Sequence, residues 1–304
     1  MVEERSEANG SVRVLVVGGQ SRAAQAFREC VSKKGIFSPS VLVRKSACEL
    51  PGERIETIQD YFDPGSDLLQ STDVVINFVG LTGRRRDAEL RSINVEGPIR
   101  LAQSAKRQGV RHFVHLSSLA VYGSAKDINA DTPDAPITPY GHSKREADKE
   151  LAELADPGFV VTILRAPTLY GPGQPGKLGQ LASTMSRLGW FPVGQYLQLR
   201  STLHLRNLAA ALIEAVQRRL RGIQFAADPQ PFALDILAQV IGEHRGRNIR
   251  LLRLPALAFL PMRVLAPGFH ASVYGRSLIQ EEACVTPPSG YPLSLRAGLK
   301  DLLR

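Results

Sequence analysis

Cysteine is scarce in this sequence. There are only three, Cys30, Cys48 and Cys284, and they lie far apart. A disulfide framework needs several cysteines at regular spacing, and a zinc site needs Cys or His in closely spaced pairs. Neither pattern is present, so we expect no disulfide framework and no bound metal. Unpaired cysteines are typical of the reducing cytosol, which predicts a cytoplasmic location.

Long hydrophobic runs are also missing. The most apolar stretch, Leu254 to Pro267, is too short to cross a bilayer and contains Pro255, Pro261 and Arg263. We interpret it as a buried helix of a substrate-binding region, with contact to a membrane surface as the alternative. Residues 1–10 are polar and have no apolar core, which predicts a disordered lead rather than a signal peptide.

Acidic residues are outnumbered by basic ones. The chain has 38 Lys and Arg against 29 Asp and Glu, which gives a formal net charge of +9. The arginines are scattered, and no basic stripe interleaved with aromatics is present, so nucleic acid is not an expected partner. A basic balance also suits a protein that binds small molecules carrying phosphate groups.

Strand-like and helix-like segments alternate through the first half of the chain. Short apolar runs such as Val12–Val17 and Asp73–Gly80 are typical of strands buried on both faces. This alternation predicts an α/β fold with a doubly wound parallel sheet. The predicted strands are Val12–Val17, Ser40–Arg44, Asp73–Gly80, Phe113–Leu116, Phe159–Arg165 and Ile223–Phe225, and the predicted helices are Arg22–Lys33, Ile93–Gln108, Tyr140–Leu154, Leu178–Gly189 and Asn207–Arg218.

Tyr140 and Lys144 lie one helical turn apart at the start of a predicted helix. Thr138 suits the N-cap of that helix and Pro139 its first turn. A nearby ammonium lowers the pKa of a phenol, and a hydroxyl from Ser118 would share the same substrate oxygen. Such a set can move a proton at a carbinol while a nicotinamide moves the hydride. The alternative is that Tyr140 only anchors the helix end.

Further motifs are spread over nearly the whole chain and occur in a characteristic order. They are Val14–Gly19, Gln59–Asp60, Asn94–Gly97, Ser117–Gly123 with Tyr140 and Lys144, Arg165–Gly173 and Tyr291–Leu299. Together they resemble the extended short-chain dehydrogenase/reductase family, in its NAD-dependent epimerase/dehydratase branch that acts on nucleotide sugars. The resemblance implies that Ser118, Tyr140 and Lys144 are catalytic and that Lys144 also holds the nicotinamide ribose.

The resemblance also implies how the chain is divided. Residues 11–165 would form a dinucleotide-binding Rossmann domain, with a returning segment near 201–227. Residues 166–200 and 228–304 would form a smaller substrate-binding lobe over the carboxyl ends of the strands, where such sheets bind ligands.

The expected cofactor site begins at the glycine turn after the first strand. Where the family has Gly-x-x-Gly-x-x-Gly, this chain has Gly18, Ser21 and Ala24. The replacements are small, so the turn and its packing should survive, although Ser21 would hold a phosphate slightly away unless its hydroxyl donates to it. The alternative is a turn that no longer binds a dinucleotide. The remaining cofactor-binding residues that the resemblance implies are Gly19, Arg22, Arg44, Asp60, Val79, Asn94 and Lys144.

Arg44, at the end of the second predicted strand, indicates the choice of cofactor. Enzymes that use NAD place a carboxylate there, whereas an arginine suits the 2′-phosphate of NADP. Arg44 is followed by Lys45, and Arg22 lies in the glycine turn. We therefore expect NADP to be favoured over NAD. The alternative is that Arg44 is only a solvated strand end.

For the substrate, the resemblance implies a nucleotide-diphosphate sugar. Arg200 would grip the diphosphate, with Arg276 as a second candidate, and Lys177 stands where relatives commonly have an asparagine that contacts the nucleotide. Thr82 and Ser118 complete the expected substrate site. The alternative for Arg200 is an exposed loop charge.

The predicted function is a nucleotide-sugar 4-epimerase. Related dehydratases carry Asp-Glu directly after the catalytic hydroxyl residue, and this chain has Leu119 and Ala120 there, which argues against dehydration. An NADP-dependent reductase of a keto-sugar or another carbonyl stays open, as does a dinucleotide-binding scaffold or regulator without catalysis. The resemblance further implies a role in polysaccharide biosynthesis, and it leaves a homodimer open.

Overall fold

The computed structural model describes residues 11–45, 49–83, 85–173, 176–196, 199–265, 273–285, 287 and 290–303. The predicted disordered lead over residues 1–10 lies outside these ranges, and so does Cys48. Cys30 and Cys284 are free thiols. Among the described residues, no group of three or more His, Cys, Asp or Glu side chains is arranged to hold a metal ion.

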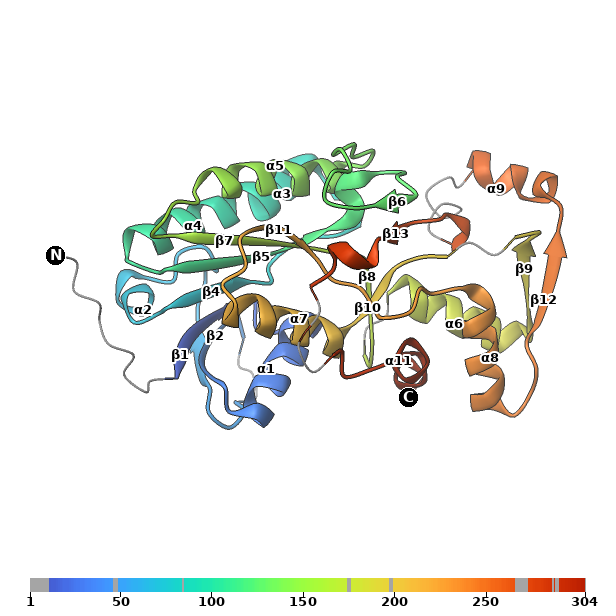
Figure 1. Ribbon diagram of the computed structural model, residues 1–304, viewed down its shortest axis with the longest axis horizontal. Coiled ribbons are helices and arrows are strands. Elements are labelled where there is room, and N and C mark those ends of the chain that lie inside the picture. The colour runs from blue at the N-terminus through green and yellow to red at the C-terminus, as the bar shows by residue number, and fades with distance from the viewer. Residues whose placement is uncertain are drawn as a thin grey trace. The chain divides into compact units, whose positions relative to one another are not determined.

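A seven-stranded sheet forms the framework of the fold (Figure 1), and its strand order is β11-β7-β5-β4-β1-β2-β3. The strands are β1 (Val12–Val17), β2 (Phe37–Val43), β3 (Arg54–Thr57), β4 (Val74–Asn77), β5 (His112–Ser118), β7 (Val160–Ala166) and β11 (Gly222–Phe225). All neighbouring pairs from β5 to β3 are parallel. The strand order switches direction between β1 and β4, which confirms a doubly wound parallel α/β sheet.

Four of the predicted helices have boundaries within two residues of those observed, and the fifth, predicted to begin at Ile93, begins at Gly97 as α4. The structure has these five helices and others that the sequence pattern did not delimit. They are α1 (Arg22–Lys34), α2 (Ser66–Gln70), α3 (Asp87–Arg91), α4 (Gly97–Arg107), α5 (Pro139–Glu153), α6 (Lys177–Leu188), α7 (Leu205–Gln217), α8 (Leu234–Arg245), α9 (Leu260–Leu265) and α11 (Leu295–Leu302). Short turns of helix are η1 (Ser92–Glu96), η2 (Leu119–Tyr122), η3 (Ala256–Phe259) and η4 (Glu281–Ala283).

Three short parallel strand pairs complete the structure. They are β6 (Asp127–Ile128) with β13 (Leu278–Ile279), β8 (Thr168–Tyr170) with β10 (Thr202–His204), and β9 (Trp190–Gly194) with β12 (Arg250–Leu254). Strand β10 lies within the predicted returning segment near 201–227. The other strands of these pairs are too short and irregular to be recognised from hydrophobic alternation. In the part of the chain that is described, no helix has the length and apolar character needed to cross a membrane.

The chain divides into two compact units. Unit 1 comprises residues up to 116, 146–163 and 215–222, and unit 2 comprises 117–145, 164–214 and 223–304. The predicted domain boundaries at 165, 201 and 228 lie elsewhere and stay a prediction.

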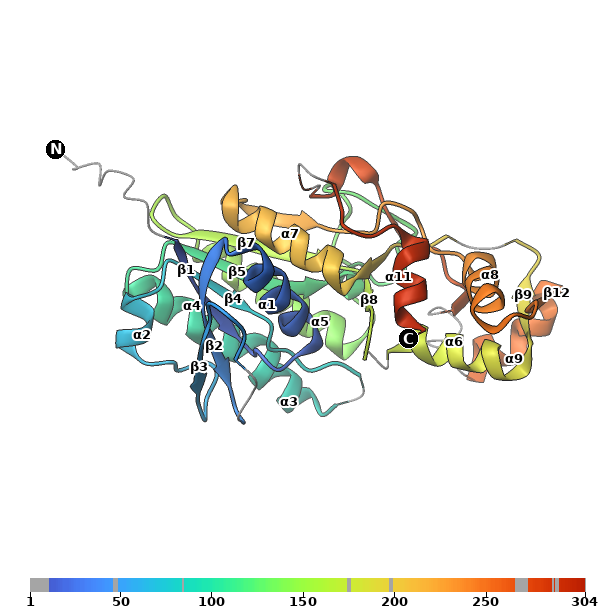
Figure 2. The ribbon, with the colours of Figure 1, turned by 90° about the horizontal axis from the view of Figure 1, so that it is seen from below.

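Each unit has its own core. In unit 1, Leu101 and Ala105 of α4 pack against Leu15 and Val17 of β1. Figures 1 and 2 show α1 on the other side of the strands, where Phe27 lies 5.9 Å from Phe78 between ring centroids. In unit 2, buried side chains of α6, α8 and α11 form the core. The two faces of β1 and β4 are therefore both covered, as their mostly apolar sequences require.

One prediction for unit 2 is wrong. The apolar stretch from Leu254 was expected to form a buried helix, but the structure has the short η3 and α9 there, and Phe259 is their only buried residue. Pro255 and Pro261 fall at the starts of these two turns, so no helix long enough to present a continuous packing face forms.

Candidate functional site

Ser118 is the last residue of β5 and the N-cap of η2. Its Oγ accepts a hydrogen bond from the backbone N–H of Ala120 at 3.2 Å. A hydroxyl that accepts one bond keeps its own proton for donation. Ser118 is half-buried, so this donor is held in place by the turn while remaining within reach of a ligand.

Tyr140 lies at the start of α5, as the sequence predicts. The Oγ1 of Thr138 accepts from the N–H of Gly141 at 3.0 Å, which is the expected N-cap, and Pro139 is the first helical residue. Lys144 follows one turn later and is 3% exposed. An ammonium with so little solvent around it depends on the groups packed next to it for its stabilisation.

Gly141 explains why this helix can approach the turn that carries Ser118. A Cβ at Gly141 would lie 2.5 Å from the carbonyl oxygen of Ala120 and 3.1 Å from the Cβ of Pro136. Any other residue would therefore push the start of α5 away from the 118–120 turn. The structure thus brings the segments of Ser118 and Tyr140 into backbone contact within unit 2.

A buried arginine braces the same turn. Arg165 is 2% exposed, and its Nη1 donates to Tyr122 Oη and to Asp134 Oδ1, each at 2.7 Å. Its guanidinium also stacks over the Tyr122 ring, 4.9 Å from the centroid. Asp134 is a residue that sequence reasoning missed, because it lies in an irregular loop whose partner is 31 residues away. Arg165, which belongs to one of the sequence motifs, therefore stabilises η2 through its contacts with Tyr122.

A second buried network, around Asp228, holds the loop that follows β7. Asp228 accepts from Tyr170 Oη at 2.7 Å, from the N–H of His204 at 2.9 Å and from Asn207 Nδ2 at 2.7 Å. Burial raises the pKa of the Asp228 carboxyl, and these hydrogen bonds oppose that rise. Burial likewise raises the pKa of Tyr170. The network joins β8, β10 and α7 and thereby fixes Tyr170 in the segment that follows β7.

Lys177 and Arg200, two of the predicted substrate residues, lie close enough to affect each other. The pKa of Lys177 is lowered by burial and then by the positive charge of Arg200. Burial lowers the pKa of Arg200 as well. The backbone of Arg200 is fixed by two hydrogen bonds with Phe232, at 2.9 and 2.7 Å. Two cations that disfavour each other in this way would be stabilised by a bound anion.

Arg276, the second candidate for the same anion, is engaged elsewhere. Its Nη2 donates to Asp127 Oδ1 at 2.6 Å and its Nε to the same oxygen at 3.2 Å. The hydrogen bond with Asp127 raises the pKa of Arg276. The backbone next to it pairs with the strand of Arg200, since Ser201 N donates to Ser277 O at 2.8 Å. Anion binding by Arg276 stays a prediction that would require this ion pair to open.

In unit 1, the glycine turn has the shape that a dinucleotide needs. Gly18 has a φ of +83°, and a Cβ there would lie 2.8 Å from Val79 Cγ2. At Gly19 a Cβ would lie 2.1 Å from Val41 Cγ1. Ser21 caps α1 by accepting from the N–H of Ala24 at 3.2 Å. Both glycines are therefore required, and the turn stays tight without the family's second and third glycine. The residues present thus fit a dinucleotide.

Sequence reasoning missed the ion pair that supports this turn. Arg28 of α1 is buried and donates from Nη1 to the carbonyl oxygen of Gly19 at 3.1 Å. Its Nε donates to Glu53 Oε2 at 3.0 Å, and its Nη2 to the other oxygen of the same carboxylate. A signal was present, because Arg28 lies on the helix face that Ala24 and Val31 bury.

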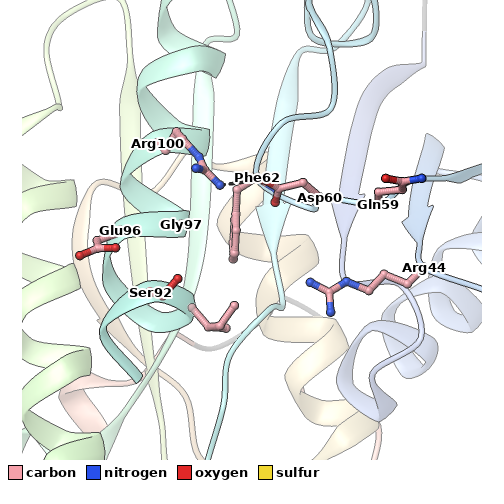
Figure 3. A pocket seen from close by; sticks show the side chains of 9 residues that line it. Arg44, Gln59, Asp60, Phe62, Ser92, Glu96, Gly97 and Arg100 are labelled. Carbon is pink, nitrogen blue, oxygen red and sulfur yellow. Dashed lines mark hydrogen bonds and ion pairs between the residues drawn. The ribbon is translucent and has the colours of Figure 1, made fainter. Parts of the chain in front are cut away.

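Arg44 and Asp60 line one cavity of about 280 Å³ in unit 1 (Figure 3). The guanidinium of Arg44 lies 5.0 Å over the Tyr61 ring, and its backbone N–H donates to Tyr61 Oη at 3.1 Å. The other lining residues come from the loop after β3 and from η1 and α4, namely Gln59, Phe62, Ser92, Ile93, Glu96, Gly97 and Arg100. The cavity therefore joins the end of β2 to the predicted adenine segment.

Asp60 is held by partners inside the protein. Its Oδ1 accepts from the N–H of Phe62 at 2.9 Å, and its Oδ2 accepts from Arg100 Nη2 at 2.8 Å. Arg100 was missed, although it is the residue that follows the Asn-Val-x-Gly motif by three positions. Adenine binding by Asp60 stays a prediction, and the structure gives the carboxylate a defined role in shaping the cavity.

The other predicted residues of unit 1 lie around the loop that follows β4. The N–H of Val79 donates to Asn77 Oδ1 at 3.0 Å. Asn94 is buried and clamps Leu81, accepting from its N–H at 2.7 Å and donating to its carbonyl oxygen at 3.0 Å. Thr82, next along the chain, is exposed. Asn94 thus positions this loop, and cofactor or substrate contacts by these residues stay predictions.

Arg22 opens α1 and is exposed. Its Nη1 donates to Gln25 Oε1 at 3.2 Å, one turn along the helix. The side chain therefore lies along α1, and a phosphate contact by Arg22 stays a prediction.

Curated relatives of this chain include a UDP-glucose 4-epimerase and a ketoreductase. The protein y4nL of Sinorhizobium fredii is 33% identical over 178 residues, 56% of this chain and 50% of that protein. The UDP-glucose 4-epimerase of Vibrio cholerae is 31% identical over 160 residues, 49% of each. The chain thus spans about half the length of these two. A 4-hydroxy-2-methyl-3-oxo-4-farnesyl-3,4-dihydroquinoline-1-oxide ketoreductase of Stigmatella aurantiaca is 23% identical over 257 residues, 80% of this chain and 76% of that protein.

Solved structures share the fold over almost the whole chain. A UDP-glucuronic acid 4-epimerase from Bacillus cereus, in complex with NAD, has a TM-score of 0.75 at 17% identity and covers 95% of this chain and 97% of its own. MoeE5 in complex with UDP-glucose and NAD has a TM-score of 0.74 at 22% identity and covers 97% of both chains. The model of the NAD dependent epimerase/dehydratase family matches residues 15–225. The chain therefore belongs to that family and is an enzyme of the extended short-chain dehydrogenase type.

Proposed function

We propose that this protein is an NAD(P)-dependent nucleotide-sugar 4-epimerase. The observation that carries the proposal is the close approach of α5 to the turn after β5, which holds Ser118, Tyr140 and Lys144 in one part of unit 2. Family membership and the 4-epimerases among the relatives support it. Lys177 and Arg200 supply the positive charge that a nucleotide diphosphate requires.

The cofactor in this proposal is a nicotinamide dinucleotide, as it is in the solved structures of the B. cereus epimerase and MoeE5. When bound, it accepts and returns the hydride of the sugar C4. The turn of Gly18 and Gly19 would hold its pyrophosphate, since the fit argued above rests on two positions where no side chain can be placed. The cavity of Arg44 would hold the adenosine end.

Tyr140 and Ser118 perform the proton chemistry of the proposal. The Tyr140 phenolate would take the proton of the sugar 4-hydroxyl, and the Ser118 hydroxyl would donate to the same oxygen as it becomes a carbonyl. Lys144, one turn later and almost fully buried, would stabilise the phenolate by its charge. The same phenol returns the proton after the keto-sugar has turned its other face to the cofactor, so epimerisation needs no second acid.

The choice between NADP and NAD is a second part of the proposal. Arg44 carries an exposed guanidinium at the end of β2, and Tyr61 beneath it keeps it over the cavity. A planar guanidinium can bind a phosphate through two parallel hydrogen bonds. NADP is therefore the proposed preference.

A carbonyl reductase is the second candidate. It is favoured by Arg44, because reductases draw on free NADPH. The S. aurantiaca ketoreductase also favours it, since that sequence matches 80% of the chain and the UDP-glucose 4-epimerase of V. cholerae matches 49%. The same Ser118, Tyr140 and Lys144 would protonate the product alkoxide. A scaffold without catalysis would require that Ser118, Tyr140 and Lys144 take part in no reaction. The cytoplasmic location is a separate prediction and stays one.

The test begins with the purified protein. Its bound dinucleotide is released by denaturation and identified by mass and absorbance, and two activities are then measured. An epimerase retains the cofactor and interconverts UDP-glucose and UDP-galactose without added dinucleotide. A reductase consumes added NADPH with a 4-keto nucleotide sugar or another ketone. Protein that binds the cofactor and shows neither activity would contradict both candidates and leave the scaffold.

A further inference from the structure

The α9 surface, which consists of Leu257, Leu260, Val264 and Leu265, exposes large apolar side chains in a short stretch of unit 2. Their exposed fractions are 77%, 48%, 69% and 84%. They recur at i, i+3, i+7 and i+8, which places them along one side of a helical path. Single exposed leucines are ordinary, but four together on two short turns indicate a surface that meets another apolar phase.

The opposite side of the same turns is anchored in the protein. Phe259 is 6% exposed and its ring centroid lies 4.9 Å from that of Tyr274. The Tyr274 Oη in turn donates to the carbonyl oxygen of Pro192 at 3.0 Å. In both views α9 lies beside the β9–β12 pair (Figures 1 and 2). The outward direction of the α9 surface is therefore fixed by packing, and the four apolar side chains cannot simply fold inward.

The sequence that contains the α9 surface carries charge of one sign. From His244 to Gln280 the sequence contains six arginines and no aspartate or glutamate. Arg263 of α9 is exposed, and so are Arg250 and Arg253 of the adjacent β12. This segment supplies much of the chain's net charge of +9. Apolar side chains flanked by arginine are the combination that binds the interface of an anionic bilayer.

We propose that η3 and α9 dock this protein on the surface of a membrane rich in anionic phospholipid. The apolar side chains would enter the boundary between headgroups and acyl chains, and Arg253 and Arg263 would contact the headgroup phosphates. A second copy of the chain is a poorer occupant, because a symmetric contact would bring the arginines of both copies to one interface. The surface is separate from Ser118 and Tyr140 in the sequence, so the inference does not depend on the proposed reaction.

The experiment is co-sedimentation of the full-length protein with vesicles. Vesicles of phosphatidylcholine with phosphatidylglycerol are compared with vesicles of phosphatidylcholine alone, at low and high salt. We expect binding to the anionic vesicles that weakens with salt, because screening reduces the arginine contribution. The Val264→Asp/Leu265→Asp variant should bind at least about tenfold more weakly, since it replaces two inserted apolar side chains by charges.

Two controls make the outcome decisive. Ile223 is 46% exposed on β11, so Ile223→Asp makes the same kind of change at another exposed apolar site and should leave vesicle binding unchanged. Leu257→Ser changes the surface without adding charge and should weaken binding in the same direction. Circular dichroism melting curves identify any variant that does not fold. Equal binding by wild type and both surface variants, no binding by wild type, or a dimer that the variants dissociate would each overturn the proposal.

Discussion

Tyr140 is the residue on which the proposed chemistry depends most directly. Tyr140→Phe keeps the ring but removes the group that takes the substrate proton, and acid–base participation contributes about 10²–10⁴-fold to rate. We expect turnover to fall by that factor, with little change in the affinity for nucleotide sugar. Steady-state kinetics and calorimetry measure the two quantities. Tyr274→Phe is the matched control, because it removes a phenol hydroxyl that donates to the carbonyl oxygen of Pro192 and has no role in the proposed reaction. Unchanged turnover in Tyr140→Phe would mean that Tyr140 is a helix-end anchor.

Arg44 is the residue that should decide the cofactor. Replacing it by aspartate removes a charge-assisted contact to the 2′-phosphate, worth about 1.5–3 kcal/mol. Arg44→Asp should therefore weaken NADP by roughly tenfold or more and spare NAD or improve it. Arg54→Asp, an exposed arginine on the neighbouring strand β3, makes the same charge change and should leave both affinities nearly equal to those of wild type. Parallel loss of NADP and NAD affinity in Arg44→Asp would show that Arg44 does not read the 2′-phosphate.

Single residues also show the limit of reading function from a motif. Thr138 and Pro139 predict the start of α5, and the structure confirms Thr138 as the N-cap and Pro139 as the first helical residue. Both predictions hold because the two residues act through local backbone geometry. Asp60 and Arg276 also match expected positions, but their partners, Arg100 and Asp127, lie 40 and 149 residues away. A sequence pattern carries no information on such distant pairing, so it could not indicate that these charges are already engaged.

At the scale of elements, the ion pair between α1 and Glu53 supports the glycine turn. Arg28 and Glu53 have side chains 5% and 0% exposed, and removing one partner leaves the other charged and buried. Arg28→Ala should therefore destabilise the protein by about 3–5 kcal/mol. Arg86→Ala, which breaks the exposed pair with Glu89, should leave the stability almost unchanged. Urea unfolding measures both.

A double variant separates the charge effect from packing. Arg28→Met with Glu53→Leu removes both charges together and should recover much of the stability lost in Arg28→Ala, because no unpaired charge is left in the core. The carbonyl oxygen of Gly19 still loses its donor, so dinucleotide affinity should stay reduced even where stability returns. Full recovery of affinity would show that Arg28 does not position the turn.

Elements that bury a regular apolar face were predictable, and those defined by distant pairing were not. The positions of β1, β4 and α6 were predicted to within a few residues. The two strands are mostly apolar, and the buried side chains of α6 recur at helical spacing. Strand β3 was missed because its four residues Arg-Ile-Glu-Thr are mostly polar and lie at the edge of the sheet. The failure at α9 has a different cause. Hydrophobicity alone cannot distinguish a buried helix from one that is exposed for docking.

At the scale of the whole molecule, each unit contains a fully buried histidine whose pKa lies well below its ordinary value, His112 in unit 1 and His204 in unit 2. His112 of unit 1 bonds through Nε2 to Thr162 Oγ1 at 2.8 Å, and its Nδ1 has no partner among the described residues. His204 of unit 2 accepts from the N–H of Arg206 at Nδ1. Burial lowers the pKa of each imidazole to about 4. Arg219 and Arg221 add to the effect at His112, whereas at His204 the carboxylate of Asp301 opposes it and Arg206 adds to it. Protonation of either ring would place a second N–H and a charge in the core.

This pair of histidines makes the stability of both units depend on pH. The native imidazoles stay neutral down to about pH 4, whereas the unfolded chain takes up their protons near its ordinary pKa of about 6.5. The unfolded state therefore binds more protons between these values, and stability is lost as pH falls from about 6.5 to about 4, by roughly 3 kcal/mol for each histidine. Asp73, with its pKa lowered to about 2 by Arg13, adds a separate loss below about pH 4.

Urea unfolding at pH 7.5, 6.5, 5.5 and 4.5 tests this dependence. Wild type should lose stability steadily across the last three points, and His112→Gln should show a shallower decline because one titrating group is gone. His244→Gln, at an exposed position on α8, should follow wild type. If the His112→Gln profile fell as steeply as that of wild type, His112 would not contribute to the loss. The pH profile therefore reports on the burial of His112 in unit 1 and of His204 in unit 2. Neither residue takes part in the proposed reaction.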